Sequence, residues 1–129
     1  MEEKKNNEKL NAKDFFKKLQ ALEETPELFF ELQMTNKFKK SIDLSYRRNL
    51  DLTLLFEIIE KLAKNEELEE KYRRHQLKGE YVGVWECHVK PDWLLMWTED
   101  TDKLILLLLN TATHSDFMDK RRNKLKRFC

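Results

Sequence analysis

The sequence has few of the features that mark exported, disulfide-bonded or membrane-spanning proteins. Its 129 residues include only two cysteines, Cys87 and Cys129. No apolar run approaches the ~18 residues needed to cross a bilayer, and the longest, at 104–109, suits a buried strand. Residues 1–5 are charged and lack the apolar stretch of a signal peptide. We therefore expect a cytoplasmic protein with no membrane contact and no disulfide.

Histidine is also scarce, and its placement is the first functional signal. The three histidines, His75, His88 and His114, all lie in the C-terminal half of the chain. A structural role is open for each of them. So is a zinc site completed by Asp92 or Asp116, although no histidine pair has helical i, i+4 spacing. The third possibility is acid–base catalysis, because imidazole can both accept and donate a proton near neutral pH.

Cys87 is adjacent to His88 but is not expected to react with it. Both residues lie on a predicted strand, where successive side chains point to opposite faces. A thiol–imidazole pair is therefore excluded, and Cys87 is predicted to be a small core residue.

RNA cleavage is a reaction that suits this residue set. It needs a base for the 2′-hydroxyl, an acid for the leaving 5′-oxygen and cations for the phosphate. Aromatic residues such as Trp93 can stack on a nucleobase.

Charge is unevenly distributed along the chain. Residues 1–118 hold 19 Lys and Arg against 23 Asp and Glu, whereas residues 119–129 hold 6 against 1. Such a basic end is either simply solvated or a phosphate-binding arm. We treat 119–129 as a basic C-terminal tail. We treat 1–27 as an N-terminal extension, partly disordered and containing a short amphipathic helix.

The helical part of the remaining domain is predicted from apolar spacing. Residues 28–34 are predicted as a first strand. Thr35 or Asn36 then caps one helix, and a second helix starts at Asp51. Each helix has an apolar stripe that predicts burial against a core.

In the second half of the chain, the spacing of apolar residues changes from a helical to an extended pattern. Three runs, 79–89, 93–97 and 103–109, are separated by short turns and predict an antiparallel meander. The predicted fold is α+β, in the order strand, helix, helix and three strands. It consists of a small antiparallel sheet with two helices on one face and the other face free for a ligand.

Two segments together resemble the YafQ branch of the RelE/YafQ family of bacterial ribosome-dependent mRNA interferase toxins. The family pattern reads roughly DHxLKGxxxGxRECHIxPDWLLxY, followed by RTGTHSDLF. This chain has RHQLKGEYVGVWECHVKPDWLLMW at 74–97 and NTATHSDFM at 110–118. The motifs occur in the family's order at a compatible spacing. The resemblance covers about residues 28–118.

The resemblance implies a toxin domain at 28–118 with the RelE-like microbial RNase fold. It implies an active site formed by His75, His88, Asp92 and His114. The family cleaves mRNA on the ribosome, without a metal or other cofactor, by attack of a 2′-hydroxyl on the adjacent phosphate. His114 is then expected to be the acid, and His75 or His88, steadied by Asp92, the base.

The same resemblance implies binding partners. Trp93 is expected to support the site or to contact RNA. Apart from the resemblance, Arg73, Arg74 and Lys78 flank His75 and are expected to contact RNA. A cognate antitoxin protein is expected to silence the toxin in a toxin–antitoxin hetero-oligomer.

Three positions depart from the family pattern. Trp85 and Asn110 stand where the pattern has arginine, and Met118 stands where it has phenylalanine. The arginines are expected to hold the scissile phosphate, which neither replacement can do. Two interpretations therefore stand. The chain is a working endoribonuclease, or it is a catalytically degenerate member that acts as an antitoxin-binding or RNA-binding module.

Overall fold

The structure, a computed structural model, describes residues 9–114, 118–119 and 124–125. The helices of this part are α1 (Ala12–Glu23), α2 (Asn36–Arg47) and α3 (Leu52–Ala63). Its strands are β1 (Glu31–Met34), β2 (His75–Gln76), β3 (Trp85–Lys90), β4 (Trp93–Asp100), β5 (Ile105–Thr113), β6 (Met118–Asp119) and β7 (Lys124–Leu125). Within the described ranges, no helix has both the length and the apolar character to span a bilayer.

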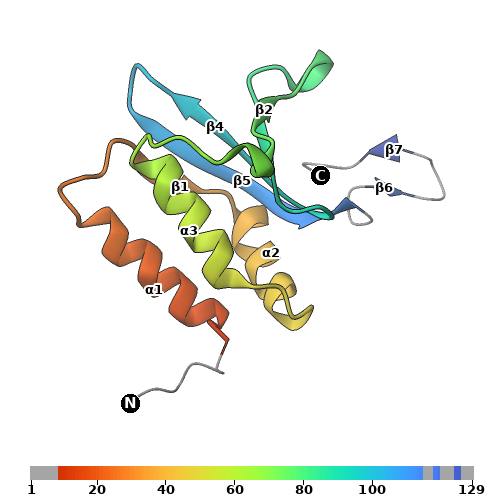
Figure 1. Cartoon of the computed structure of the whole chain (residues 1–129), viewed down its shortest axis with the longest axis horizontal. Coiled ribbons are helices and arrows are strands. Elements are labelled where there is room, and N and C mark those ends of the chain that lie inside the picture. Colours follow the sequence, from red (N-terminus) through yellow and green to blue (C-terminus); the bar gives the residue numbers. More distant parts are fainter. Residues whose placement is uncertain (1–8, 115–117, 120–123, 126–129) are drawn as a thin grey trace.

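Strands β1 to β5 form one mixed sheet in the order β1-β5-β4-β3-β2 (Figure 1). Neighbours pair antiparallel, except that β1 lies parallel to β5. The prediction of an antiparallel sheet is therefore wrong for the edge strand β1. A parallel pair requires a long crossover, and the whole segment from α2 to β4 supplies it.

The chain between β2 and β3 also differs from the prediction. Residues 79–89 were expected to form one strand, but Gly79–Tyr81 form a 3-10 turn and β3 begins only at Trp85. Gly79 and Gly83 have φ of +71° and +95°, a backbone conformation that favours glycine. The glycines turn the chain so that the short strand β2, which was not predicted, pairs with β3.

Both predicted helix starts are confirmed. The Thr35 hydroxyl accepts a hydrogen bond from the Phe38 backbone N–H at 3.0 Å. The Asp51 carboxylate accepts one from the Thr53 N–H at 3.0 Å. These caps satisfy backbone donors that a first helical turn leaves without a partner.

Helix α1 belongs to the domain, which corrects its interpretation as part of an extension. Its residues Phe15, Leu19 and Leu22 are buried in the same hydrophobic cluster as the apolar face of α3. Figure 1 shows α1 beside α3. The predicted disorder near the N-terminus covers residues 1–12, of which 1–8 lie outside the described residues, whereas Ala12 already begins α1.

The predicted basic tail is described only in part. Strands β6 and β7 pair antiparallel. Residues 120–123 and 126–129, which hold most of the basic charge, lie outside the described residues. Both interpretations of the tail, a solvated end and a phosphate-binding arm, therefore stay predictions.

The helices cover one face of the sheet, and the core lies between the two layers. Strand β4 contributes Trp93, Leu95 and Trp97 to this core. Because side chains alternate along a strand, Leu94 and Met96 point to the other face, where they pack with Ala112 in a second, smaller cluster. This second face carries the histidines.

Candidate active site

The sheet brings the three predicted histidines together. His75 on β2 lies opposite Glu86 on β3, and His88 lies opposite Leu94 on β4. His114 directly follows β5. The ring centroids of His75 and His88 are 6.3 Å apart, and those of His88 and His114 are 6.0 Å apart. The rings thus form a row across strand ends that are distant in sequence.

Both ring nitrogens of His75 face acceptors. Nδ1 lies 2.7 Å from the Arg73 carbonyl oxygen, and Nε2 lies 3.2 Å from Glu86 Oε1. A carbonyl can only accept a hydrogen bond, so Nδ1 carries a proton. When the ring is doubly protonated, both of its N–H groups therefore have an acceptor, the Arg73 carbonyl and Glu86.

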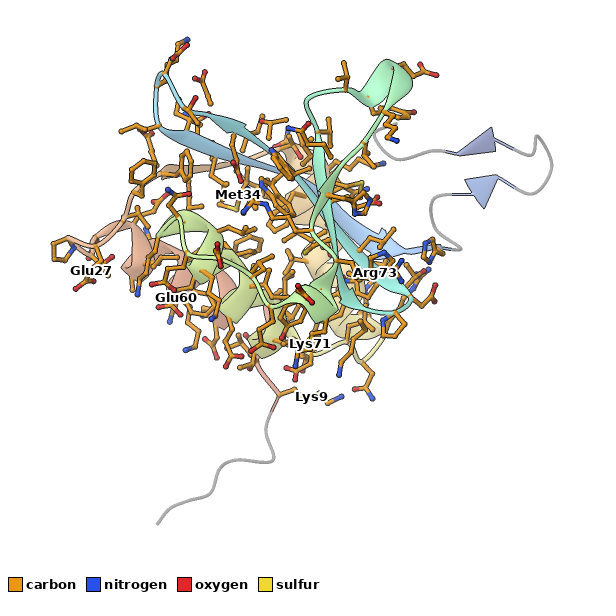
Figure 2. The ribbon with its side chains drawn as sticks, turned by 45° about the horizontal axis from the view of Figure 1, so that its top comes forward. Lys9, Glu27, Met34, Glu60, Lys71 and Arg73 are labelled. Atoms are coloured by element: carbon orange, nitrogen blue, oxygen red, sulfur yellow. The ribbon has the colours of Figure 1, made fainter. Side chains whose placement is uncertain are left out.

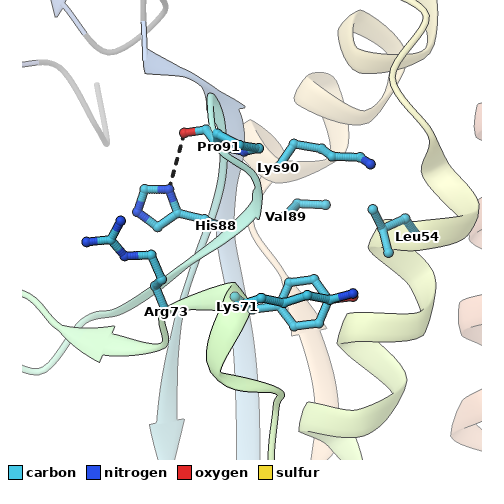
Figure 3. Close-up of a pocket in the computed structure, with 8 residues that line it drawn as sticks. Leu54, Lys71, Arg73, His88, Val89, Lys90 and Pro91 are labelled. Carbon is cyan, nitrogen blue, oxygen red and sulfur yellow. Dashed lines mark hydrogen bonds between the residues drawn. The ribbon is translucent and has the colours of Figure 1, made fainter.

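His88 has a different pattern. Its Nδ1 lies 3.3 Å from the Pro91 carbonyl oxygen and donates to it, as Figure 3 shows. Within the part of the chain that the structure describes, no hydrogen bond occupies Nε2. A neutral ring in this tautomer has its free lone pair on Nε2. The pairing of β3 with β4 shifts between His88 and Lys90, an irregularity of the kind that re-aims side chains near functional sites.

His114 is paired with the predicted carboxylate. Its Nδ1 lies 3.1 Å from Asp92 Oδ1, and its backbone N–H donates to the same oxygen at 3.3 Å. The two side chains are 51% and 71% exposed. Asp92 therefore orients His114, whereas the prediction had Asp92 steadying His75 or His88.

Arg73 supplies a cation beside the histidines. It lines one pocket together with His75, Glu86 and His88, and Figure 3 shows its guanidinium beside the His88 ring. Its backbone is left-handed, with φ of 55°, which is uncommon for a residue other than glycine. The carbonyl of Arg73 is the acceptor for His75 Nδ1. Arg73 therefore provides both a cation in this pocket and the acceptor for the neighbouring imidazole.

Arg74, also predicted to contact RNA, lines the same pocket, but its guanidinium is engaged by other side chains. Its guanidinium lies 4.3 Å from the Trp85 ring and 6.0 Å from the Trp97 ring. Its Nη2 lies 2.8 Å from Glu99 Oε2, which also accepts the indole N–H of Trp97 at 2.9 Å. These contacts hold Arg74 in a structural network, so its charge is largely compensated by Glu99.

Trp93 and Lys78, unlike Arg74, are not among the residues that line the pockets beside His88. Trp93 is 1% exposed and belongs to the core. It can support the site, but its ring cannot stack on an RNA base, and we correct that expectation. Lys78 is exposed in the connection from β2 to β3 and lines neither of the two pockets that contain His88.

Glu86 is a site residue that the sequence reasoning missed. Its side chain is 5% exposed and lies 3.2 Å from His75 Nε2. Its spacing of two residues from His88 on one strand places both on the same face, which was the available signal. A buried carboxylate is rarely retained without a charged partner.

Cys87 is a core residue, as predicted. It is fully buried on the face opposite to His88. Burial, with a smaller contribution from Glu86, raises the pKa of its thiol to about 12. The thiol is therefore uncharged at neutral pH and is not a nucleophile.

The described residues hold no group of three His, Cys, Asp or Glu side chains arranged to bind a metal ion. Asp116, a candidate zinc ligand in the sequence, lies outside the described residues. The expectation that the site works without a metal remains a prediction.

Fold and site together define a small α+β protein with a row of three histidines on a sheet face, two of which are paired with a carboxylate. Residues 30–119 match the family described as "Bacterial toxin of type II toxin-antitoxin system, YafQ". The chain therefore belongs to the YafQ family of bacterial type II toxins.

Individual relatives agree with this assignment. The mRNA interferase toxin YafQ of Escherichia coli K12 is 31% identical over 86 residues, which cover 66% of this chain and 91% of the relative. The structure of the E. coli DinJ–YafQ toxin–antitoxin complex matches with 28% identity and a TM-score of 0.64, over 71% of this chain and 100% of that one. A metal-bound toxin from Helicobacter pylori matches with 32% identity and a TM-score of 0.63, over 67% and 97%.

Proposed function

We propose that this toxin is a ribosome-dependent endoribonuclease that cleaves mRNA by acid–base catalysis. The observation that carries the proposal is the row of three imidazoles about 6 Å apart, each with a different set of hydrogen-bond partners. The name of the E. coli relative, an mRNA interferase, supports the substrate class.

His88 is the general base in this proposal. Its Nε2 lone pair is free to take the proton of a 2′-hydroxyl, because Nδ1 donates to Pro91. His75 is less suited to that role, since both of its nitrogens already face acceptors. The deprotonated 2′-oxygen attacks phosphorus and forms a cyclic phosphate.

His114 is the general acid. Asp92 holds Nδ1–H, so Nε2–H of the protonated ring is left to donate to the 5′-oxygen as its bond to phosphorus breaks. The proton that leaves the 2′-hydroxyl is thereby matched by one delivered to the leaving group. His88 and His114 are returned to their starting states by proton exchange with water.

In this proposal Arg73 and the doubly protonated form of His75 stabilise the negative charge of the phosphate. Both line the pocket that contains His88. Glu86 orients His75 by accepting from Nε2–H when that nitrogen carries a proton, while Arg73 adds the net positive charge that the His75–Glu86 pair does not supply.

The two departures from the family arginines bear less on catalysis than the sequence suggested. Trp85 packs against the core under the helices, on the opposite face from Glu86 and His88. Its side chain does not point toward the site, so its replacement is not a lost phosphate ligand there. Asn110 lies opposite Met96 on the histidine face and is buried, with its Oδ1 accepting from the Thr111 N–H. Of the two replaced arginine positions, only Asn110 lies on that face, and in this proposal Arg73 supplies the cation there.

Replacing Trp85 with arginine is expected to destabilise the protein without raising its activity. The variant loses aromatic burial and the stack with Arg74 and places a second guanidinium beside the first, at a cost of about 1–3 kcal/mol. Urea unfolding measures the loss, and Trp85→Phe is the control that keeps an aromatic ring. A tenfold gain in mRNA cleavage by Trp85→Arg would instead place position 85 at the RNA.

We further propose that the partner is an antitoxin encoded with the toxin. The E. coli relative has been solved in complex with DinJ, and this chain covers all of that toxin chain. The alternative function, an inactive antitoxin-binding module, rests on the same partner but requires no cleavage.

Induction in a bacterial host tests the two functions. The nuclease should arrest growth and cut a reporter mRNA, and the cuts should disappear when the reporter's start codon is removed, because an untranslated message does not enter ribosomes. Cleavage that persists without the start codon would contradict ribosome dependence. Normal growth and intact mRNA with folded protein that binds the antitoxin would favour the inactive module.

A further inference from the structure

A second pocket adjoins the row of histidines on the side of helix α3 (Figure 3). Its volume is about 550 Å³, within the range typical of small-ligand sites. Its walls are largely apolar and are formed by Leu54, Tyr72, Val89 and Pro91. Tyr72 belongs to the connection that follows α3 and offers an aromatic ring, over one face of which the exposed Lys71 Nζ lies 5.2 Å from the ring centroid.

The charged residues that line this pocket are all basic. They are Lys71, Arg73 and Lys90, and no Asp or Glu is among the lining residues. Figure 2 shows Lys71 and Arg73 in the same connection. Lys71 is paired with Glu69 at 3.3 Å, at a solvent-exposed site. Arg73 and Lys90 have no carboxylate partner among the described residues. The pocket thus combines an apolar interior with a cationic rim.

The pocket is continuous with the candidate active site. His88 and Arg73 line both pockets, so a ligand in one touches the residues that act in the other. In the proposed function His88 contacts the 2′-hydroxyl. The base attached to that same ribose must therefore lie next to His88.

We infer that this pocket binds the nucleobase of the nucleotide that carries the attacking 2′-hydroxyl, an inference that rests on the proposed function. The base stacks on Tyr72 between the walls formed by Leu54 and Pro91, and Arg73 and Lys90 meet the flanking phosphates. Base stacking combined with a basic groove is the usual chemistry of single-stranded RNA sites. A peptide segment of an antitoxin suits the pocket less well, because a purely apolar segment would leave the basic rim without partners.

The test is binding of a trinucleotide that has a 2′-deoxy sugar at the scissile position and cannot be cleaved. Titration into the full chain, followed by NMR, should shift the Tyr72 and Val89 amide signals. Tyr72→Leu keeps apolar volume but removes the ring, and Leu54→Trp fills the pocket. Each should weaken binding at least tenfold. Tyr46→Leu, at an exposed tyrosine on α2, should leave the affinity unchanged.

The basic rim is tested with a matched pair of exposed lysines. Lys90→Gln should weaken binding and reduce its salt dependence, whereas Lys103→Gln, in the turn between β4 and β5, should not. The inference would be overturned if the trinucleotide shifted only NMR signals of other regions, or if it bound wild type and Leu54→Trp with equal affinity. It would also be overturned by shifts of Tyr72 and Val89 on adding antitoxin peptide but not RNA.

These results are separable from the test of catalysis. Binding at Tyr72 by a chain that cuts no mRNA would uphold the pocket and reject the nuclease. Ribosome-dependent cleavage whose base preference is the same in Leu54→Trp as in wild type would uphold the nuclease and reject the pocket.

Discussion

Replacing His114 with glutamine is expected to lower the rate of mRNA cleavage by about 10²–10⁴-fold, the usual contribution of a general acid. The reason is that protonated Nε2, with Nδ1–H held by Asp92, is the donor aligned for the leaving oxygen. Because the side chain is 51% exposed, the substitution should change the free energy of unfolding by less than about 0.5 kcal/mol. Single-turnover cleavage on programmed ribosomes measures the rate.

Asp92→Asn is the matched control for this prediction. Its side chain is 71% exposed, and such an ion pair contributes only about 0–1 kcal/mol, so the rate should fall by no more than about fivefold. Antitoxin binding by both variants checks that the fold is intact. Wild-type cleavage by His114→Gln would remove His114 from the mechanism. An equal loss in both variants would give Asp92 a direct chemical role.

Replacing Phe15 with alanine is expected to lower the free energy of unfolding by about 3–5 kcal/mol, the usual cost of deleting a buried phenylalanine ring. Phe15 is fully buried in the core cluster that also contains Ile58 and Ile59 of α3. Urea unfolding followed by circular dichroism measures this loss, and a lowered midpoint with an unchanged slope would show that stability alone has changed.

Phe16→Ala provides the comparison within the same helix. Phe16 is only partly buried and contacts the Phe15 ring edge-on at a centroid distance of 5.6 Å. Its removal should cost less than half as much. Equal unfolding midpoints for Phe15→Ala and wild type would mean that α1 is an appendage after all, as the sequence had suggested.

The residues of the candidate site could be found from the sequence. Which histidine acts as the base and which as the acid could not. The motif around His88 and the segment around His114 identified the three histidines. Which imidazole has a free lone pair depends on neighbours such as the Pro91 and Arg73 carbonyls. Those carbonyls come from a turn and from a left-handed residue, neither of which side-chain patterns specify. The same holds for Trp93, whose aromatic character predicted stacking on RNA although its ring is buried.

The sequence by itself determined where helices α2 and α3 of this protein begin. Thr35 and Asp51 start helices because their side chains cap neighbouring backbone N–H groups, an interaction within one turn. The tertiary structure alone decided that α1 joins the core and that β1 pairs parallel with β5. The pattern of apolar residues in a helix or strand indicates only that the element buries one face. Which surface buries it depends on contacts between residues far apart in the chain, and those contacts also bring His75, His88 and His114 into one row.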